Sequence, residues 1–448
     1  MAERFVPPYP PRPAAPVPSW RGLYGERART LVYGWSERAF SETYLFRKVL
    51  GWRVHIPLEP QAIQHVLLNN AANYEKPRLV KTLLAPVIGR GLLTSDGPLW
   101  RAQRQIVAAS FNPPAVDALV PVFAAQAERR AKGWAGGVLD VAEEATTTTM
   151  QVITEALFSG DKRLTSRTAL THIAAALEGF SEARLQVLMG LPVFPVTLRG
   201  LRGLRGQAYL RRTLTQIVEE RLRPGAPDDF VTGMIHALSE KYSRAEAVSL
   251  AVDNAATFYL AGHETTANSI TWTLYLLSEQ PDLQEAVAAE AQAALASGAD
   301  ARLPTRLPLL QSVVEESLRL YPAAPRFDRE AIGEDEICGY RVRRGDFVSI
   351  WPWLLHRHRA LWDDPDAFDP QRFTPDRKKG RHRFQYIPFG AGPRTCVGAR
   401  FAIAEALTIL AVWIARWSFG SVRRPVRLSG SVTLRPLGGM PLKMTPRS

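Results

Sequence analysis

The part of the sequence best suited to chemistry is a short loop around one cysteine. Residues 389–398 are Phe-Gly-Ala-Gly-Pro-Arg-Thr-Cys-Val-Gly, and a helical pattern begins directly after them. Gly390, Gly392 and Gly398 predict a tight turn, whose exposed amides and helix dipole favour a metal-binding thiolate on Cys396. Zinc does not fit, because it takes about four protein ligands, or three and a water. The alternative is a structural cysteine after a glycine-rich turn.

A second motif lies in the middle of a long predicted helix. Ser243 and Glu246 have the spacing of a capping box, and no proline follows until Pro281. That length corresponds to roughly 55 Å of helix. Its centre, residues 261–266, is Ala-Gly-His-Glu-Thr-Thr. Glycine costs about 1 kcal/mol relative to Ala, and threonine hydroxyls can bond the carbonyl four residues back. We therefore expect a local break, where a ligand could approach the backbone.

The polar residues of this motif have simpler interpretations as well. Glu264 could be a solvated helix charge, and Thr265 could merely bend the helix. His263 and Glu264 begin the H-E-x-x-H pattern of zinc proteases, but the fifth position is Ala267, so that interpretation fails.

Two pairs of side chains share a helical face elsewhere. Glu316 and Arg319 are three residues apart and can form an ion pair, with Glu315 as a rival partner. Trp100 and Arg104 are four residues apart, and an indole N–H beside a guanidinium suits a carboxylate. Taken alone, the first pair is a helix salt bridge. For the second pair alone, an amphipathic tryptophan beside a surface arginine is the favoured interpretation.

The cysteine loop fits F-x-x-G-x-R-x-C-x-G at every fixed position and resembles the haem-binding loop of the cytochrome P-450 monooxygenases. The resemblance implies that Cys396 is the proximal thiolate on the iron of haem b. It also implies that Arg394 pairs with a haem propionate and that Phe389 packs near the thiolate side of the porphyrin. Gly390 and Gly398 belong to the same haem-binding loop.

Residues 261–266 resemble the oxygen-activation motif [AG]-G-x-[DE]-T-[TS] of that family. Oxygen activation needs protons, and an acid beside a hydroxyl can relay them through water. The resemblance implies that Thr265 holds water at the oxygen site and that Glu264 feeds the relay.

The helix with Glu316 and Arg319 resembles the E-x-x-R helix of the family, whose buried pair is joined by an arginine from a later loop. Here that residue is Arg372, within Phe-Asp-Pro-Gln-Arg-Phe at 368–373. The family more often has Glu where Gln371 stands. The resemblance implies that the triad is structural and holds the fold around the cysteine loop.

The spacing of Trp100 and Arg104 resembles the W-x-x-x-R helix of the family, which assigns both to haem propionates. Arg329 matches another propionate position, with Arg326 as its competitor.

Composition limits the class of protein. The chain has 448 residues, 46% of them hydrophobic, and 56 Lys and Arg against 43 Asp and Glu, so its formal net charge is +13. Its cysteines, Cys338 and Cys396, can make at most one disulfide, which excludes a disulfide scaffold and favours a reducing compartment. No nucleic-acid-binding module is recognised despite the basic pI. We expect a soluble, cytoplasmic monomer that binds no nucleic acid.

The order of elements predicts a mainly α fold with a small β region. Residues 1–20 predict an extended Pro-rich arm without a signal peptide, and residues 21–448 a single triangular cytochrome P-450 domain around haem b. The apolar run Phe401–Phe419 is broken by Glu405 and Arg416, which favours a core helix over an integral membrane span. The sequence also predicts a strand at 51–58, a helix at 60–68, a hairpin at 337–351 that turns at residues 344–346, and a hairpin between 422 and 444 that contains Gly438 and Gly439.

Two basic segments could meet partners. Residues 377–383 precede the cysteine loop, and basic clusters attract acidic partners, so we expect an acidic ferredoxin or flavodoxin to dock there. A solvated charged loop is the alternative. The second segment could touch an anionic membrane or, as we favour, cover the substrate entrance. It consists of Arg199, Arg202, Arg205, Arg211 and Arg212 between Leu198, Leu201 and Leu204.

The predicted reaction is insertion of one atom of O2 into a lipophilic small molecule such as a fatty acid, terpenoid or aromatic compound. Fatty acids are slightly favoured. Electrons would come from NAD(P)H through a reductase and a separate carrier. Alternatives are a peroxide-using or isomerising haem-thiolate enzyme and a haem sensor or carrier. Residues 75–93 and 178–198 are predicted lids. The predicted substrate pocket consists of Phe258, Ala261, Ala323, Ala324, Pro325, Phe327, Gly438, Gly439 and Met440.

Overall fold

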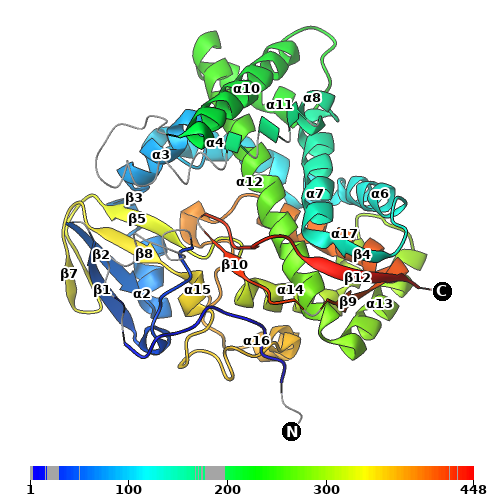
Figure 1. Ribbon diagram of the computed structural model, residues 1–448. Coiled ribbons are helices and arrows are strands. Elements are labelled where there is room, and N and C mark those ends of the chain that lie inside the picture. The colour runs from blue at the N-terminus through cyan, green and yellow to red at the C-terminus, as the bar shows by residue number, and fades with distance from the viewer. Residues whose placement is uncertain are drawn as a thin grey trace. The chain divides into compact units, whose positions relative to one another are not determined.

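The computed structural model shows a mostly helical chain with small sheets, which confirms the predicted fold class (Figure 1). It describes residues 4–15, 17, 30–49, 51–166, 168–169, 171–172, 175–176, 197–422, 424–430 and 432–447. The chain divides into two compact units. Unit 1 contains residues 1–74, 116–149 and 264–448, and unit 2 contains residues 75–115 and 150–263. The expectation of a single domain over residues 21–448 stays a prediction.

A mixed sheet forms one part of unit 1, with the strand order β1-β2-β8-β5-β3 among the described residues. Its strands are β1 (Tyr44–Val49), β2 (Trp52–Pro57), β3 (Tyr74–Glu75), β5 (Phe327–Ala331) and β8 (Phe347–Ile350). β2 is the predicted strand at 51–58, and it runs parallel to β8. The predicted helix at 60–68 is α2 (Pro60–Gln64), which continues into a π-helical turn, η3 (His65–Asn69).

The predicted hairpin at 337–351 is wrong. β7 (Tyr340–Val342) pairs instead with the preceding strand, β6 (Asp335–Ile337), while β8 belongs to the larger sheet. The tight turn is at Cys338 and Gly339, whose φ angles are +51° and +78°. Consecutive positive φ angles suit a two-residue hairpin turn. The turn expected at residues 344–346 is present, since Gly345 has a φ angle of +86° and the Asp346 N–H donates to the Arg343 carbonyl oxygen at 3.0 Å. It joins β7 to a strand of another sheet, so it closes no hairpin.

The second predicted hairpin is present in a shorter form. It consists of β10 (Leu428–Ser429) and β11 (Arg435–Pro436). Gly438 and Gly439 follow it and lead into β12 (Pro441–Pro446). β12 lies between β9 (Trp417–Ser421) and β4 (Gly137–Asp140) in a separate sheet, close to the C-terminus (Figure 1).

The helical core of unit 1 is built around α17 (Ala399–Arg416), which is buried along most of its length. It packs against α6 (Val120–Ala131) and α13 (Pro281–Ala296), and the indole N–H of Trp413 donates to the Ala127 carbonyl oxygen at 3.1 Å. The run Phe401–Phe419 is therefore a core helix followed by a strand, as predicted. Further helical segments are η2 (Glu37–Phe40), η4 (Ala71–Asn73), η6 (Leu303–Arg306), α14 (Pro308–Leu320), α15 (Pro352–Leu355), η7 (Pro370–Phe373), α16 (Pro375–Lys378) and η8 (Gly392–Arg394).

Within the described ranges, no single helix is long and apolar enough to cross a membrane. One bent pair, Gly97–Phe111 with Pro113–Ala131, meets the length and composition requirements only when its two helices are taken together.

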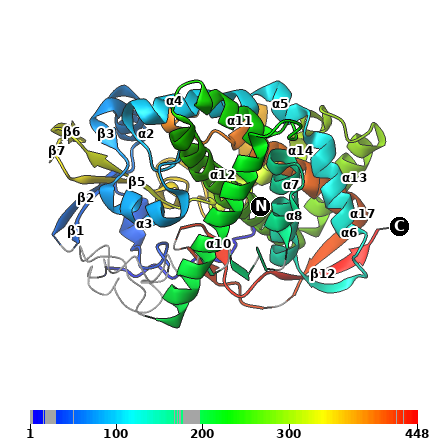
Figure 2. The same cartoon turned by 90° about the horizontal axis from the view of Figure 1, so that it is seen from above.

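Unit 2 is helical. Its segments are α3 (Arg78–Ile88), α4 (Gly97–Ala108), η5 (Ala109–Phe111), α8 (Lys162–Thr165), α10 (Leu198–Arg221) and α11 (Phe230–Ser239). α10 and α11 lie side by side (Figure 2). Three helices have residues in both units, namely α5 (Pro113–Asp117), α7 (Val141–Phe158) and α12 (Arg244–Ser278).

α12 is the long helix predicted from the capping box, and Ser243 Oγ accepts the Glu246 N–H at 3.4 Å. The expected break at residues 261–266 is wrong, because the helix continues through them. The glycine has a packing role instead. A Cβ on Gly262 would lie 2.8 Å from Cδ1 of Ile153 on α7.

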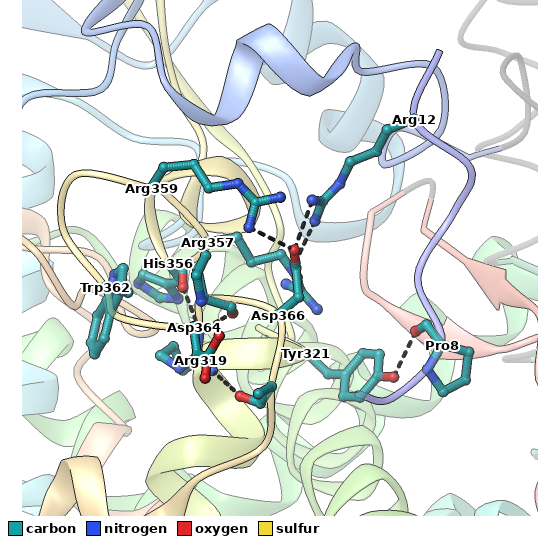
Figure 3. A network of polar contacts seen from close by, with 12 residues as sticks. Pro8, Arg12, Arg319, Tyr321, His356, Arg357, Arg359, Trp362, Asp364 and Asp366 are labelled. Atoms are coloured by element: carbon teal, nitrogen blue, oxygen red, sulfur yellow. Dashed lines mark hydrogen bonds and ion pairs between the residues drawn. The ribbon is translucent and has the colours of Figure 1, made fainter. Parts of the chain in front are cut away.

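The N-terminal arm packs against other parts of unit 1 (Figure 3). Residues 4–13 have no regular secondary structure, yet the Pro8 carbonyl oxygen accepts the Tyr321 hydroxyl at 2.7 Å. Arg12 binds both carboxylate oxygens of Asp366 at 2.9 and 2.5 Å, and its guanidinium lies 3.8 Å from the ring centroid of Phe40. Burial raises the pKa of Asp366, but the Arg12 hydrogen bonds and the charges of the neighbouring arginines outweigh it, so that pKa is lowered.

We predict that Arg12→Ala lowers the free energy of unfolding by about 2 to 3 kcal/mol. This is less than the usual 3 to 5 kcal/mol for breaking a buried pair, since Asp366 keeps an ion pair with Arg359. Denaturant unfolding would measure it. Arg38→Ala is the control, because Arg38 pairs with Glu42 on the surface, and it should change the free energy by less than about 0.5 kcal/mol. Equal losses in both variants would contradict the anchoring of the arm.

Candidate functional site

The cysteine loop is closed by backbone hydrogen bonds. Cys396 donates its N–H to the Phe389 carbonyl oxygen at 2.9 Å, and Gly390 donates to Ile387 at 3.0 Å. Gly390 and Gly392 have φ angles of +69° and +71°, which favour glycine. The Cys396 side chain is exposed and precedes the first turn of α17, where the helix dipole stabilises an anion. The loop therefore presents a thiol in a setting that favours its thiolate.

The loop also lies against η3 at very short range. A Cβ on Gly392 would be 1.9 Å from the Leu67 carbonyl oxygen and 2.8 Å from its carbon. Backbone atoms cannot rotate away as a side chain can. Gly392 is therefore required for contact as well as for its positive φ angle.

A buried ion pair supports the loop from α14. Arg319 and Glu316 are fully buried, and Arg319 Nε and Nη2 donate to the two carboxylate oxygens at 2.7 and 2.8 Å. Arg372 Nε lies 3.4 Å from Glu316 Oε1. The structure thus brings the three predicted members together. The rival, Glu315, forms its ion pair with Lys378 instead.

His356, which sequence reasoning missed, connects this pair to the cysteine loop. Its carbonyl oxygen accepts from Arg319 Nη1 at 2.8 Å, and its Nε2 accepts the N–H of Ile387 at 2.9 Å. Burial, together with the charges of Arg319 and Arg357, lowers the pKa of His356 well below its usual value. A neutral imidazole can accept this bond, whereas an imidazolium has no free lone pair. In the sequence, the only sign of His356 is the His-Arg pair at positions 356–357.

β5 places an arginine beside the loop. Phe327 Cζ lies 3.9 Å from the position of a Cβ on Gly390, and the buried Arg329 lies over the Phe327 ring at 5.5 Å. The competitor, Arg326, is held by the carboxylate of Asp328 at 2.8 and 2.6 Å. This arrangement favours Arg329 over Arg326 as the residue facing an anion near the loop.

The motif on α12 is the accessible part of an otherwise buried stretch. Residues 251–260 and 266–278 are buried, whereas Ala261 is exposed and Gly262, Glu264 and Thr265 are half-buried. Positions 261, 264 and 265 share one helical face. Glu264 Oε1 accepts the Thr433 hydroxyl at 2.6 Å. Sequence reasoning missed Thr433, because it is 169 residues away from Glu264 along the chain.

In unit 2, Trp100 and Arg104 are half-buried and one turn apart on α4. The buried Gln103 fixes this helix, since its Oε1 accepts from Asn254 Nδ2 at 2.5 Å and its Nε2 donates to the Arg90 carbonyl oxygen at 3.0 Å. The structure presents the predicted pair on a firmly held helix.

The predicted pocket residues have different environments. Phe258 packs between Phe111 and Phe230, with ring centroids 5.3 and 5.0 Å away. Met440 is buried, and its N–H donates to Asp140 Oδ1 at 2.8 Å. A surface pocket of about 320 Å³ is lined by residues that include Trp134 and Glu144, and by none of the predicted site residues.

The predicted lids are described only in part, because residues 178–196 lie outside the described ranges. The other lid ends in a loop whose Arg90 N–H donates to Asp253 Oδ2 at 2.7 Å. Arg211 of α10 binds the same carboxylate at 2.8 Å. Arg211 is therefore committed to an ion pair, while Leu198, Leu201 and Leu204 are exposed on the same helix.

The side chains at and beside the cysteine loop fit haem better than a metal ion bound by protein ligands alone. The described part of the chain contains no group of three or more His, Cys, Asp or Glu side chains that could hold a metal. One exposed cysteine on a glycine-rich loop fits a metal whose remaining ligands belong to a macrocycle. Arginine and an aromatic ring beside that loop suit an anionic, flat cofactor.

Comparison with known proteins agrees with this geometry. The cytochrome P450 family profile matches residues 37–438, so the chain belongs to the cytochrome P450 family. Cyclooctatin synthase of Streptomyces melanosporofaciens is 32% identical over 87% of this chain and 86% of its own. Cytochrome P450 4V2 of Rattus norvegicus is 30% identical over 85% and 78%.

Solved structures have the same fold. The cytochrome P450DA heme domain superposes with a TM-score of 0.83, at 23% identity over 99% of each chain. CYP175A1 from Thermus thermophillus superposes with a TM-score of 0.72, at 26% identity over 91% of this chain and 92% of that one. Family membership implies haem b as the cofactor.

We predict that Gly392→Ala destabilises the protein by about 3 kcal/mol or more and lowers its haem content, because the new methyl group meets backbone atoms. Gly380→Ala is the matched control. Gly380 also has a positive φ angle, +77°, but no atom lies within 4 Å of its Cβ position. It should cost only the left-handed strain of about 1 to 2 kcal/mol. Thermal unfolding and haem absorbance would rank the variants, and equal losses would contradict the close contact with Leu67.

Proposed function

We propose that the protein is a haem-thiolate monooxygenase in which Cys396 would supply the thiolate that binds the haem iron. The observation that carries this proposal is the cysteine loop, in which the Phe389 carbonyl and the Leu67 contact fix the thiol at the N-terminal end of α17. Haem b, when bound, supplies the chemistry of O2 activation. The protein contributes the thiolate and the groups that hold the cofactor.

In this proposal the arginines and the indole bind the haem propionates. Arg394 and Arg329 come from the loop and from β5, while Trp100 and Arg104 come from α4. A guanidinium can bind a carboxylate through two parallel hydrogen bonds, and an indole N–H adds one donor. Phe389, Gly390 and Gly398 shape the loop around the ligand.

Glu264 and Thr265 deliver protons in this proposal. The Thr433 hydroxyl donates to Glu264 Oε1, so that oxygen acts as an acceptor and the carboxylate is oriented. Thr265, on the same accessible face, would hold a water with its hydroxyl group. General acid–base groups of this kind typically contribute factors of 10² to 10⁴.

The substrate is a lipophilic small molecule, and a fatty acid, a terpenoid and an aromatic compound remain the candidates. Electrons come from NAD(P)H through a reductase and an acidic ferredoxin or flavodoxin. The basic segment 377–383 offers less free charge than its sequence indicates. Arg377, Lys378 and Lys379 each have an acidic partner, namely Asp369, Glu315 and Asp376.

Cys396→Ser should abolish the red-shifted carbon monoxide band of the reduced haem protein, because serine supplies no thiolate. Cys338→Ser is the control, since Cys338 is exposed in the β6–β7 turn, and it should keep the full band. Difference spectra after reduction would test both variants. An unchanged band in Cys396→Ser would rule out this cysteine as the ligand.

Thr265→Ala should keep haem and the carbon monoxide band but divert reducing equivalents to hydrogen peroxide or water. We expect product formed per NAD(P)H to fall about tenfold, at the lower end of the general acid–base range. Thr273→Ala removes a buried hydroxyl from the same helix, where it bonds only the Ser269 carbonyl, and should leave coupling unchanged. Oxygen, NAD(P)H and peroxide are measured with a surrogate ferredoxin system. Full coupling in Thr265→Ala would contradict the relay and favour a peroxide-using enzyme.

A further inference from the structure

A second acid lies close to the oxygen-activation motif, and none of the roles above uses it. Glu405 is in the second turn of α17 and is only 1% exposed. Its carboxyl group is hydrogen-bonded to Thr266 of α12, the residue after Thr265. Cys396, the proposed iron ligand, lies nine positions before it.

The surroundings of this carboxyl are polar but uncharged. Among the described residues, Glu405 Oε1 has no hydrogen-bond partner, and neither does the hydroxyl of Thr408, which is fully buried one turn further along α17. Burial and the Thr266 hydrogen bond are the influences on this group among the described residues, and no cation contributes. Two unpartnered oxygens on one helical face are suited to a buried water.

Such an environment favours the neutral acid. An ionised carboxylate away from water and without a cation carries a large desolvation penalty. Burial accordingly raises the pKa of Glu405 well above its ordinary value of 4.5, although the Thr266 hydrogen bond opposes that change. Glutamine would satisfy Thr266 without a titratable group. A buried acid with a raised pKa beside the Glu264 and Thr265 motif therefore indicates a role for its proton.

Resting on the proposed function, we propose that Glu405 is a proton store that serves the Glu264 and Thr265 site through Thr266. The O–H bond of Glu405 breaks as its proton passes to the Thr266 hydroxyl, which releases its own proton to a water in that site. One proton leaves Glu405, one enters the site, and no electron moves. A proton from solvent then restores the acid.

The two acids have separate roles because their environments differ. Glu264 is half-buried, and its Oε1 accepts the Thr433 hydroxyl. Glu405 is enclosed and neutral.

The first test needs no turnover. Infrared spectra of the full haem-loaded protein at neutral pH should show a protonated carboxyl band that Glu405→Gln removes. The pH dependence of the protein's stability is a second test of whether Glu405 is protonated. Above pH 4.5 the unfolded chain releases this proton while the folded chain keeps it, so wild-type stability falls as pH rises. The thermal midpoint of Glu405→Gln relative to wild type should therefore rise as the pH is raised above 4.5.

The second test measures proton delivery in a reconstituted turnover assay. Glu405→Gln should increase the peroxide formed per NAD(P)H about threefold or more and enlarge the solvent isotope effect, with an unchanged carbon monoxide band. Thr266→Val keeps the acid but breaks the connection, so it should show the same peroxide increase and retain the infrared band. It also provides the test if Glu405→Gln folds poorly.

Two outcomes would overturn the proposal. An identical carboxyl band in wild type and Glu405→Gln would mean that Glu405 is ionised. A lost band with unchanged peroxide and isotope effect in both variants would make Glu405 a structural group only. Failure of the proposed function would be recognised separately, because the wild-type protein itself would then lack the carbon monoxide band or consume no O2. In that case the proton relay would be refuted as well.

Discussion

The buried pair of Glu316 and Arg319 is the interaction on which the rest of the site depends. All five guanidinium N–H groups of Arg319 have acceptors: both Glu316 oxygens and the carbonyls of His356, Pro365 and Ala367. A buried ion pair repays its desolvation only when it is fully hydrogen-bonded, and removing one partner typically costs about 3 to 5 kcal/mol. Because three of these acceptors are backbone carbonyls, the pair fixes the path of the chain as well as its own charge.

That path leads directly to the cysteine. Arg319 holds the His356 carbonyl, His356 accepts from Ile387, and Ile387 accepts from Gly390 within the loop. The N-terminal arm docks on the same region, where Tyr321 follows α14 and Asp366 precedes η7. A chain with a net positive charge can therefore bury several arginines here, because each of them contacts a carboxylate, a carbonyl or an aromatic ring.

The two glutamates near the site also differ in their electrostatic environments. Glu264 keeps access to polar neighbours, whereas Glu405 is enclosed in an apolar helix with one hydroxyl partner. Identical side chains thus have different environments, which composition and net charge could not indicate. In the same way, the basic segment 377–383 loses much of its apparent charge to ion pairs with acids outside it, such as Asp369 and Glu315.

The sequence by itself determined the elements with strong local signals. The capping box at Ser243 located the start of α12, the apolar run after Cys396 located α17, and the fixed letters around Cys396 identified the loop and its family. It failed where local patterns compete. The hairpin closes at Cys338 and Gly339, whereas the turn expected near Gly345 joins strands of two different sheets. Gly262 serves packing against Ile153 rather than a helix break. Only the tertiary structure could assign Thr433 to Glu264, His356 to Ile387 and Arg12 to Asp366. These partners are separated by 169, 31 and 354 residues, and a contact between such distant positions leaves no periodic trace in either segment.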